Sequence, residues 1–324
     1  MSSIRSYSSE RTSTAGFLRE SWCLYHSYRQ NIRQRVQDVA SDIRRAETLI
    51  ADRLGVELRN LDILEIGPGQ FLNQMQYLAM RNHIIGIDLE VIAEGANPVP
   101  YLRMLRQNGL ARTTKTVARK LLGIDRRFAA EVARELGVAG SRRMDVRQMD
   151  ACRITFPGNS FDFVYARSVF HHLPDPGAAL DGIARVLRPG GSTYILLHLY
   201  TSETGCLDPR VFTDQRDQVL GWPHLRPDLQ GTYDNHNVYL NKLRLNEWRN
   251  LFQAKMPGAQ LITTSSEESA VKAAELLHAR GEVLDYSVEE LTTSSLAVLW
   301  RKPAASQLLA SEAPGQEQLA VPAR

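Results

Sequence analysis

The stretch LDILEIGPGQFLNQMQYLA, residues 61–79, joins two apolar patterns of different period through a glycine-rich bend. Its first part, Ile63 to Ile66, is typical of a short buried strand that ends at Gly67. Its last part, Phe71 to Ala79, places apolar side chains on one face of a helix. A strand, a glycine turn and a helix in this order predict the first unit of a parallel sheet.

The same alternation continues along the chain. Helical spacing between residues 17 and 54 predicts one long helix or two, and a later helix should begin at Asp175 and end at RPGG. Because the strands are apolar and alternate with helices, we predict an α/β fold with a doubly wound, mostly parallel sheet. The predicted strands and the late helix are 83–88, 161–166, 192–199, AQLITTS, SSLAVLW and LNEWRNLFQAK.

The expected organisation is one sheet domain with a helical extension and two tails. Both tails lack apolar periodicity, and the first is also rich enough in Ser and Arg to resemble an organellar transit peptide. Two stretches, 92–143 and 200–240, follow strand ends and are expected to be insertions over the active site. The divisions are a disordered tail (1–16), a helical extension (17–58), the sheet domain (59–302) and a second disordered tail (303–324).

The composition is that of a water-soluble globular protein. The 324 residues are 43% hydrophobic and 23% charged, and no apolar run approaches the roughly 20 residues that span a bilayer. The three cysteines lie far apart, which favours reduced thiols and a cytoplasmic location. Net charge is +3, but residues 97–147 hold 12 Lys and Arg against four acids.

This basic segment has three interpretations. It could be a lid that binds a phosphorylated or carboxylated acceptor, or a surface that contacts an anionic membrane. The third is a packed helix with its arginines turned outward. The sequence leaves the three open, and it leaves the oligomeric state open as well.

Two carboxylates near the glycine bend indicate a nucleoside ligand. Asp88 ends the second strand, 19 residues after Gly69, where a carboxylate can accept hydrogen bonds from both ribose hydroxyls. Leu72 stands where a dinucleotide site needs a third glycine, and Glu65 would repel a pyrophosphate. A positively charged nucleoside suits the site better, and S-adenosylmethionine carries both a ribose and a sulfonium.

The motifs in their order resemble class I S-adenosylmethionine-dependent methyltransferases, most closely the small-molecule branch called type 11. The resemblance covers roughly residues 60–200 and implies a seven-stranded, Rossmann-like sheet whose last strand is antiparallel. The motifs that carry it are DILEIGPG, GIDLE, MDA, FDFVYARSVFHHLPDPGAAL and RVLRPGGSTYILL.

The resemblance also implies roles for particular residues. Gly67 and Gly69 would pass under the cofactor, with Glu65 near its methionine end and Asp88 at the ribose. Phe71 departs from the family, because many members have a further glycine there. The remaining implied contacts are Leu89 on adenine, Asp150 at the adenine amino group, the Ala151 N–H at a ring nitrogen, and Arg167 and Ser168 beside the methyl donor.

Histidines are the candidates for a general base, which a hydroxyl acceptor would need. His198 and His172 are the first choices because they follow strand ends, and His236 in the second insertion is next. His171, His172 and Asp175 do not form a convincing set of metal ligands, so no metal is expected.

The acceptor is expected to be a small molecule, methylated on an oxygen of a sugar-like or other secondary metabolite. Aromatic residues of the second insertion, among them Trp222 and Tyr239, would suit such an acceptor. The sequence ARSVFHH after the fourth strand lacks the motifs of amino-group and cytosine-carbon methyltransferases, so nucleic acid is not the expected substrate. The alternatives are an RNA methyltransferase that uses the basic segment and a non-catalytic binding module of the same fold.

Overall fold

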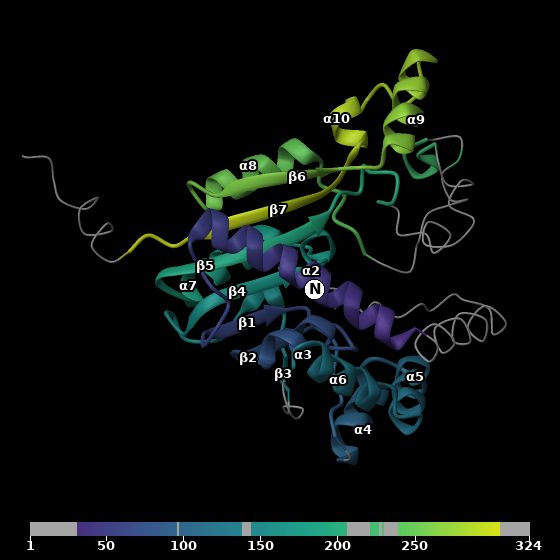
Figure 1. The fold of residues 1–324 in the computed structure, drawn as a ribbon. Helices are drawn as coiled ribbons and strands as arrows, with labels where there is room; N and C mark the ends of the chain where they lie inside the picture. The colour runs from purple at the N-terminus through teal and green to yellow at the C-terminus, as the bar shows by residue number, and fades with distance from the viewer. Residues whose placement is uncertain are drawn as a thin grey trace, which may run out of the picture.

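The protein, described by a computed structural model over residues 31–95, 97–137, 144–205, 221–226, 229 and 239–304, is built on a seven-stranded sheet. The strand order is β3-β2-β1-β4-β5-β7-β6 (Figure 1). All pairs among β1 to β5 are parallel, and β7 is antiparallel to both β5 and β6, so the predicted fold is confirmed. The strands are β1 (Asp62–Ile66), β2 (His83–Asp88), β3 (Asp145–Gln148), β4 (Phe161–Arg167), β5 (Leu187–His198), β6 (Gln260–Ser265) and β7 (Thr293–Arg301).

Helices cover both faces of the sheet (Figure 1). The α-helices are α2 (Ile32–Leu54), α3 (Asn73–Ala79), α4 (Pro98–Gln107), α5 (Leu110–Leu121), α6 (Ile124–Glu135), α7 (Pro176–Val186), α8 (Leu245–Lys255), α9 (Glu268–Ala279) and α10 (Val288–Leu291). Short 3₁₀ turns are η1 (Ala151–Arg153), η2 (Phe170–His172) and η5 (Pro223–Leu225).

Alternating side chains of the strands build two separate cores. In β1, Ile63 packs into the core shared with α2, α3 and α6, whereas Leu64 packs into the core shared with α7 and α8. Phe163 and Val164 divide in the same way in β4. Because the central strands are buried on both faces, their apolar runs are continuous, as the sequence indicated.

The helix α2 belongs to the packing of the sheet. Ile43 and Ile50 are fully buried in the same core as Phe163, and the helix ends at Gly55, whose φ of 61° suits a left-handed cap. The expected boundary at residue 58 therefore separates elements that share one core, and the proposed domain division stays a prediction.

Some expected boundaries were wrong by a few residues. The helix after the glycine bend begins at Asn73, because Leu72 has a left-handed φ of 53° and cannot continue a helix backward to Phe71. RPGG follows α7, but it forms the first part of β5. The sequence pattern did not indicate β3, which is short and largely exposed, or the helices α9 and α10.

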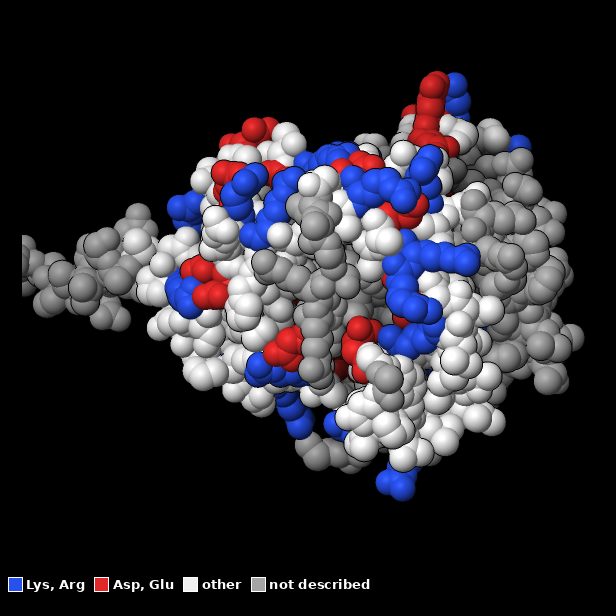
Figure 2. Space-filling model, turned by 60° about the horizontal axis from the view of Figure 1, so that its bottom comes forward, with Lys and Arg blue, Asp and Glu red and all other residues white. Residues whose placement is uncertain are grey.

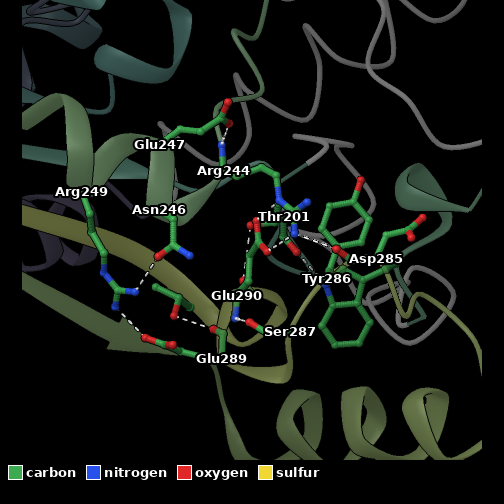
Figure 3. A network of polar contacts seen from close by, with 12 residues as sticks. Thr201, Arg244, Asn246, Glu247, Arg249, Asp285, Tyr286, Ser287, Glu289 and Glu290 are labelled. Carbon is green, nitrogen blue, oxygen red and sulfur yellow. Dashed lines mark hydrogen bonds and ion pairs between the residues drawn. The ribbon is translucent and has the colours of Figure 1, made fainter.

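A polar network holds the segment after β5 against α8 and α10 (Figure 3). Arg244 donates to both carboxylate oxygens of the buried Glu290, at 2.8 and 2.6 Å, and to the Asp285 carbonyl oxygen at 2.7 Å. The Thr201 hydroxyl donates to the Glu290 carbonyl oxygen at 3.3 Å, and the Trp222 indole N–H donates to the Thr201 carbonyl oxygen at 3.0 Å. The network therefore positions the chain where it leaves the carboxyl edge of the sheet.

Candidate active site

The two glycines of the bend have different reasons to be glycine. Both have left-handed backbones, with φ of 67° at Gly67 and 66° at Gly69. A Cβ at Gly67 would overlap the Val169 side chain, whereas a Cβ at Gly69 would meet nothing within 4 Å. Packing within the protein therefore excludes a side chain at Gly67, and Gly69 borders open space in which a ligand could approach the main chain.

Asp88 ties the glycine bend to the end of the second strand. One carboxylate oxygen accepts from the Gly69 N–H at 3.2 Å, and the other accepts from the Glu90 N–H at 2.9 Å. Burial raises the pKa of Asp88 to about 6, and the backbone hydrogen bond from Glu90 opposes this rise. The bend and the β2 end are thus held together at the carboxyl edge of neighbouring strands.

Glu65 is a buried carboxyl group with an unused oxygen. It is 3% exposed, and its Oε2 atom has no hydrogen-bond partner in the protein. Burial, with the nearby Asp88 carboxylate adding to it, raises the pKa of Glu65 to about 8. A buried unpaired carboxylate is costly, so this position favours a cationic group nearby. The ammonium and sulfonium end of S-adenosylmethionine fits that requirement.

The residues expected around adenine lie on the adjoining strand ends. Asp88 and Gln148 are partners in the β2–β3 ladder, and the Met149 N–H donates to the Asp88 carbonyl oxygen at 2.9 Å. Asp150 follows directly and caps η1 by accepting from the Cys152 N–H at 2.9 Å. Leu89 and Ala151 are the residues next to Asp88 and Asp150, so all four lie along one edge. Their contacts with a cofactor stay predictions.

Arg167 and Ser168 lie where β4 ends. Arg167 forms an ion pair with Asp42 of α2 at 2.6 Å, a contact that the sequence did not indicate. Ser168 has a left-handed φ of 59°, and its hydroxyl lies 3.1 Å from the Nε2 atom of His198. The helical extension therefore contributes a carboxylate that orients a side chain at this edge of the sheet.

The structure brings three histidines together after β4 and β5. The rings of His171 and His172 are 4.1 Å apart, and those of His171 and His198 are 5.7 Å apart, between centroids. His172 Nδ1 lies 2.9 Å from the Tyr239 carbonyl oxygen. Because a carbonyl only accepts, this nitrogen carries the proton, and Nε2 of the neutral ring is the proton acceptor. His236 lies outside the described residues.

Burial lowers the pKa of all three histidines. For His198 the positive charge of Arg167 adds to the effect, and for His171 the neighbouring His172 and His198 do so. For His172 the hydrogen bond to the Tyr239 backbone opposes it. The three rings are therefore neutral at pH 7, which is the form that can accept a proton.

Two arginines of the basic insertion reach the residues beside the glycine bend, contacts that the sequence did not indicate. Arg112 forms an ion pair at 2.8 Å with the buried Glu90, which also accepts from the Gln70 amide at 3.0 Å. Arg119 donates to the Gln70 carbonyl oxygen at 2.7 Å and stacks on Phe71, 4.3 Å from the ring centre. The interpretation with all arginines outward is therefore wrong for α5, because buried acceptors turn these two inward.

One expected acceptor contact is excluded. Trp222 is fully buried and bonded to Thr201, so it cannot stack on an acceptor. Tyr239 is 46% exposed and lies next to the histidines. Tyr233 and Asn237 of the same insertion, which could also stack on or hydrogen-bond an acceptor, lie outside the described residues. Within the described part of the chain, no three His, Cys, Asp or Glu side chains are grouped as a metal site.

The chain is similar to known methyltransferases over part of its length. Residues 103–195, from α4 into β5, match the family described as "Methyltransferase domain". The 27-O-demethylrifamycin SV methyltransferase of Amycolatopsis mediterranei (strain S699) is 33% identical over 97 residues, which are 29% of this chain and 33% of that protein. The phosphatidylethanolamine N-methyltransferase of Cereibacter sphaeroides is 30% identical over 94 residues, 29% of this chain and 45% of that protein.

The chain thus spans less than half the length of these two curated relatives in the matched region. Among solved structures, the YcgJ protein from Bacillus subtilis is 16% identical, with a TM-score of 0.42, and the match covers 81% of this chain and all of that one. The glycine bend and Asp88 precede the matched residues 103–195, so their assignment depends on the geometry above.

Proposed function

We propose that this chain, whose sheet domain belongs to the class I S-adenosylmethionine-dependent methyltransferase family, transfers a methyl group to a small molecule. The observation that carries the proposal is the buried Glu65 carboxyl group, which has an oxygen without a hydrogen-bond partner and lies near Asp88. Gly69 in the adjoining bend borders open space. Together these groups suit a nucleoside with a cationic tail. When bound, S-adenosylmethionine supplies an electrophilic methyl group.

In this proposal the chain holds the cofactor with residues from three loops. Glu65 faces its charged end, Gly69 lets the main chain approach it, and Asp88 accepts from the ribose hydroxyls. Leu89, Asp150 and Ala151 border adenine. Because the sulfonium is already activated, the protein's main task is to align donor and acceptor and exclude water.

His198 is proposed to take the proton from a hydroxyl acceptor. It is neutral at pH 7, lies at the end of β5, and has the Ser168 hydroxyl 3.1 Å from Nε2. His172 is the second candidate, since the Tyr239 carbonyl fixes its tautomer with Nε2 as acceptor. Two neutral histidines at the strand ends, which could take a hydroxyl proton, support an oxygen acceptor, as does the name of the rifamycin relative.

A lipid amine is a second candidate acceptor class. The name of the second relative, a phosphatidylethanolamine N-methyltransferase, favours it. An RNA acceptor has less support, because Arg112, Arg119 and Lys120 of the basic insertion are engaged by carboxylates of the protein itself. Labelled cofactor is incubated separately with hydroxylated secondary metabolites, with phosphatidylethanolamine and with RNA, and the mass of the labelled product separates the three acceptor classes.

Calorimetry of the full chain with S-adenosylmethionine tests the cofactor site. Asp88→Ala should weaken binding about 10- to 100-fold, because hydrogen bonds to a charged acceptor are lost. Asp145→Ala, which removes an exposed acid on β3, is the matched control and should bind as the parent does. If the parent and both variants bind S-adenosylmethionine with equal affinity, the ribose does not bind at Asp88. If the parent itself gives no heat of binding, the result supports a non-catalytic binding module.

His198→Ala tests the base separately from binding. The variant should retain cofactor affinity and lose most of its turnover, about 100-fold or more for a general base. His278→Ala, on α9 and hydrogen-bonded to the Tyr286 carbonyl, is the control for loss of a histidine elsewhere. If His198→Ala turns over as fast as the parent, His198 is not the base, and His172 becomes the candidate.

A further inference from the structure

The helix α5 shows its apolar side to the solvent. Leu110 is 71% exposed and Leu121 is 79% exposed, and the adjoining Leu122 is 49% exposed. The other exposed residues of the helix are small, and its one buried residue is Thr116. An ordinary surface helix buries its leucines and exposes its charges, so α5 has the reverse arrangement.

Ion pairs with the rest of the protein hold the helix in this orientation. On its inner side Arg112 pairs with Glu90, while Arg119 pairs with Asp125 at 2.6 Å. Lys120 pairs with Glu94 at 2.9 Å. Turning the leucines inward would leave the buried Glu90, and the partly exposed Asp125 and Glu94, without their cations, and an unpaired buried carboxylate costs more than exposing a leucine. The ion pairs on the inner side of α5 therefore fix its leucines on the solvent side.

The helix α4 extends the same apolar surface. Six of the nine large hydrophobic side chains that are exposed in the described residues lie in α4, in α5 or directly after α5. Soluble proteins rarely gather exposed apolar side chains in this way without a binding partner. The apolar face consists of Val99, Leu102, Leu105, Leu110, Leu121 and Leu122.

The exposed charged side chains of the described residues 97–137 are all positive. Among the described residues 97–137, no Asp or Glu is classed as exposed, and the acids there are half-buried in ion pairs. Figure 2, which turns the lower part of Figure 1 toward the viewer, shows a largely white area at lower right with blue on its border. The exposed charged residues of this stretch are Arg103, Arg106, Arg126, Arg127 and Arg134.

We propose that the apolar face docks on an anionic phospholipid bilayer, with its leucines in the interface and the surrounding arginines at the headgroups. None of the described helices is both long and apolar enough to cross a bilayer, so the contact would be peripheral. A second copy of the chain is a poorer occupant, because it would place arginines opposite arginines. A nucleic acid would leave the six apolar side chains without partners.

Docking would act next to the cofactor site. The outer side of α5 meets lipid, while Arg119 on its inner side holds the Gln70 carbonyl and the Phe71 ring. The docking proposal does not depend on methyl transfer, because lipid binding is measured without cofactor or acceptor. Its failure would leave the proposed activity untouched, and failure of the activity would leave docking untouched.

Vesicle flotation of the full chain tests the proposal. The protein should float with vesicles of phosphatidylcholine mixed with phosphatidylglycerol and should stay behind with phosphatidylcholine alone. Added salt should weaken binding, because it screens the arginines. Equal binding to both vesicle types, or binding to neither, would overturn the proposal.

Paired variants locate the contact. Leu121→Gln/Leu122→Gln should lower vesicle partitioning at least about tenfold, because each leucine buries several methylene groups in lipid. Leu276→Gln/Leu284→Gln, at 52% and 63% exposure, is the matched control and should bind as the parent does. Thermal unfolding of both variants checks that the fold is retained.

Arginine variants test the charge requirement. Arg106→Gln/Arg126→Gln should lower partitioning about fivefold for each arginine removed. Light scattering without lipid measures the molar mass of the parent and of the leucine variant, and so tests whether the apolar face binds a second copy. A stable dimer that disappears in the leucine variant, with no vesicle binding by the parent, would assign the apolar face to a second copy and reject the lipid proposal.

Discussion

A glycine in the bend after β1 is required for one of two physical reasons. At Gly67 the neighbour is the Val169 side chain, which fills the space that a Cβ would occupy. At Gly69 that space is open, and the N–H bonds to Asp88. The same residue type therefore serves packing at one position and access at the other, which sequence alone does not distinguish.

Alanine substitutions should separate these two reasons. Gly67→Ala should lower the free energy of unfolding by about 3 kcal/mol or more, because overlap with Val169 adds to backbone strain. Gly69→Ala should cost only about 1–2 kcal/mol, from its left-handed φ alone. Urea unfolding measures both. In a double-mutant cycle, Val169→Ala should restore part of the unfolding free energy that Gly67→Ala loses, because it removes the overlapping methyl groups. If the two losses of unfolding free energy simply add, the overlap with Val169 costs nothing.

Glu65 links cofactor binding to pH. Its pKa of about 8 means that the free protein carries a proton there at pH 7, and an adjacent cation would expel it. Affinity for S-adenosylmethionine should therefore rise from pH 6 to 8 with release of a proton. Calorimetry in two buffers of different ionisation enthalpy measures that proton. Glu65→Gln should bind without releasing it, and unchanged proton release in the variant would exclude Glu65.

The same carboxyl should limit the stability of the free protein. Since its folded pKa lies above its ordinary 4.5, its contribution is fully present below pH 4.5 and is lost as pH rises to about 8. Glu65→Gln should therefore raise the melting temperature at pH 8, by about 2–4 °C for each kcal/mol recovered, and leave it unchanged at pH 4. A scanning-calorimetry series over this range measures the difference.

At the scale of elements, α8 with its N-cap residue Arg244 is joined to α10 by two ion pairs of different burial. Glu290 is buried beneath Arg244, whereas Glu289, the partner of Arg249, is 62% exposed (Figure 3). A charge-assisted bond to a buried acceptor contributes more than a solvated pair, because water cannot replace it. Arg244 should therefore dominate this junction.

Methionine substitutions at Arg244, the N-cap residue of α8, and at Arg249 within α8 should show that difference. Arg244→Met should lower the free energy of unfolding by about 1.5–3 kcal/mol, because the Glu290 carboxylate loses its bidentate partner. Arg249→Met, from the same helix, should cost about 0.2–1 kcal/mol. Guanidinium unfolding at pH 7 compares them. Equal losses would mean that the junction depends on the packing of α8 rather than on the buried carboxylate.

For the whole molecule, burial of opposite kinds of titratable group gives two opposing dependences of stability on pH. The histidines after β4 and β5 have lowered pKa values, so their contribution is complete above about pH 6.5 and is lost as pH falls. Glu65 and Asp88 have raised pKa values and lose their contribution as pH rises. The Glu65 range, from about pH 4.5 to 8, overlaps the histidine range below about pH 6.5, so the free protein should be most stable at the pH where the two opposing slopes cancel.

Substitution of His171 should remove part of the acid-side slope. It is 5% exposed, and its pKa is lowered well below 6.5 by burial and by its neighbours His172 and His198. His171→Gln should show a smaller loss of unfolding free energy between pH 7 and pH 5 than the parent, measured by urea unfolding at each pH. Parallel curves for the two proteins would show that His171 is not the group that titrates.

Local pattern was enough to determine the sheet and one edge of the site. Strand runs such as Ile63–Ile66, the glycine bend and Asp88 at a strand end depend on residues close together in sequence, so their period and spacing can be read directly. The parallel connection then places successive strand ends at one edge. For this reason the sequence predicted both the fold and the place of Glu65 and Asp88 at the carboxyl ends of neighbouring strands, and their contacts with a nucleoside stay a prediction.

Only the tertiary structure decided which distant groups meet. The pairing of Arg167 with Asp42, the contact of Arg119 with the Gln70 carbonyl, and the clustering of three histidines join segments between about 27 and 125 residues apart. Helical period locates an amphipathic helix but does not say which side faces the protein. In α5, carboxylates from other segments, among them the buried Glu90, pair with the cations of the inner side, and the leucines face the solvent.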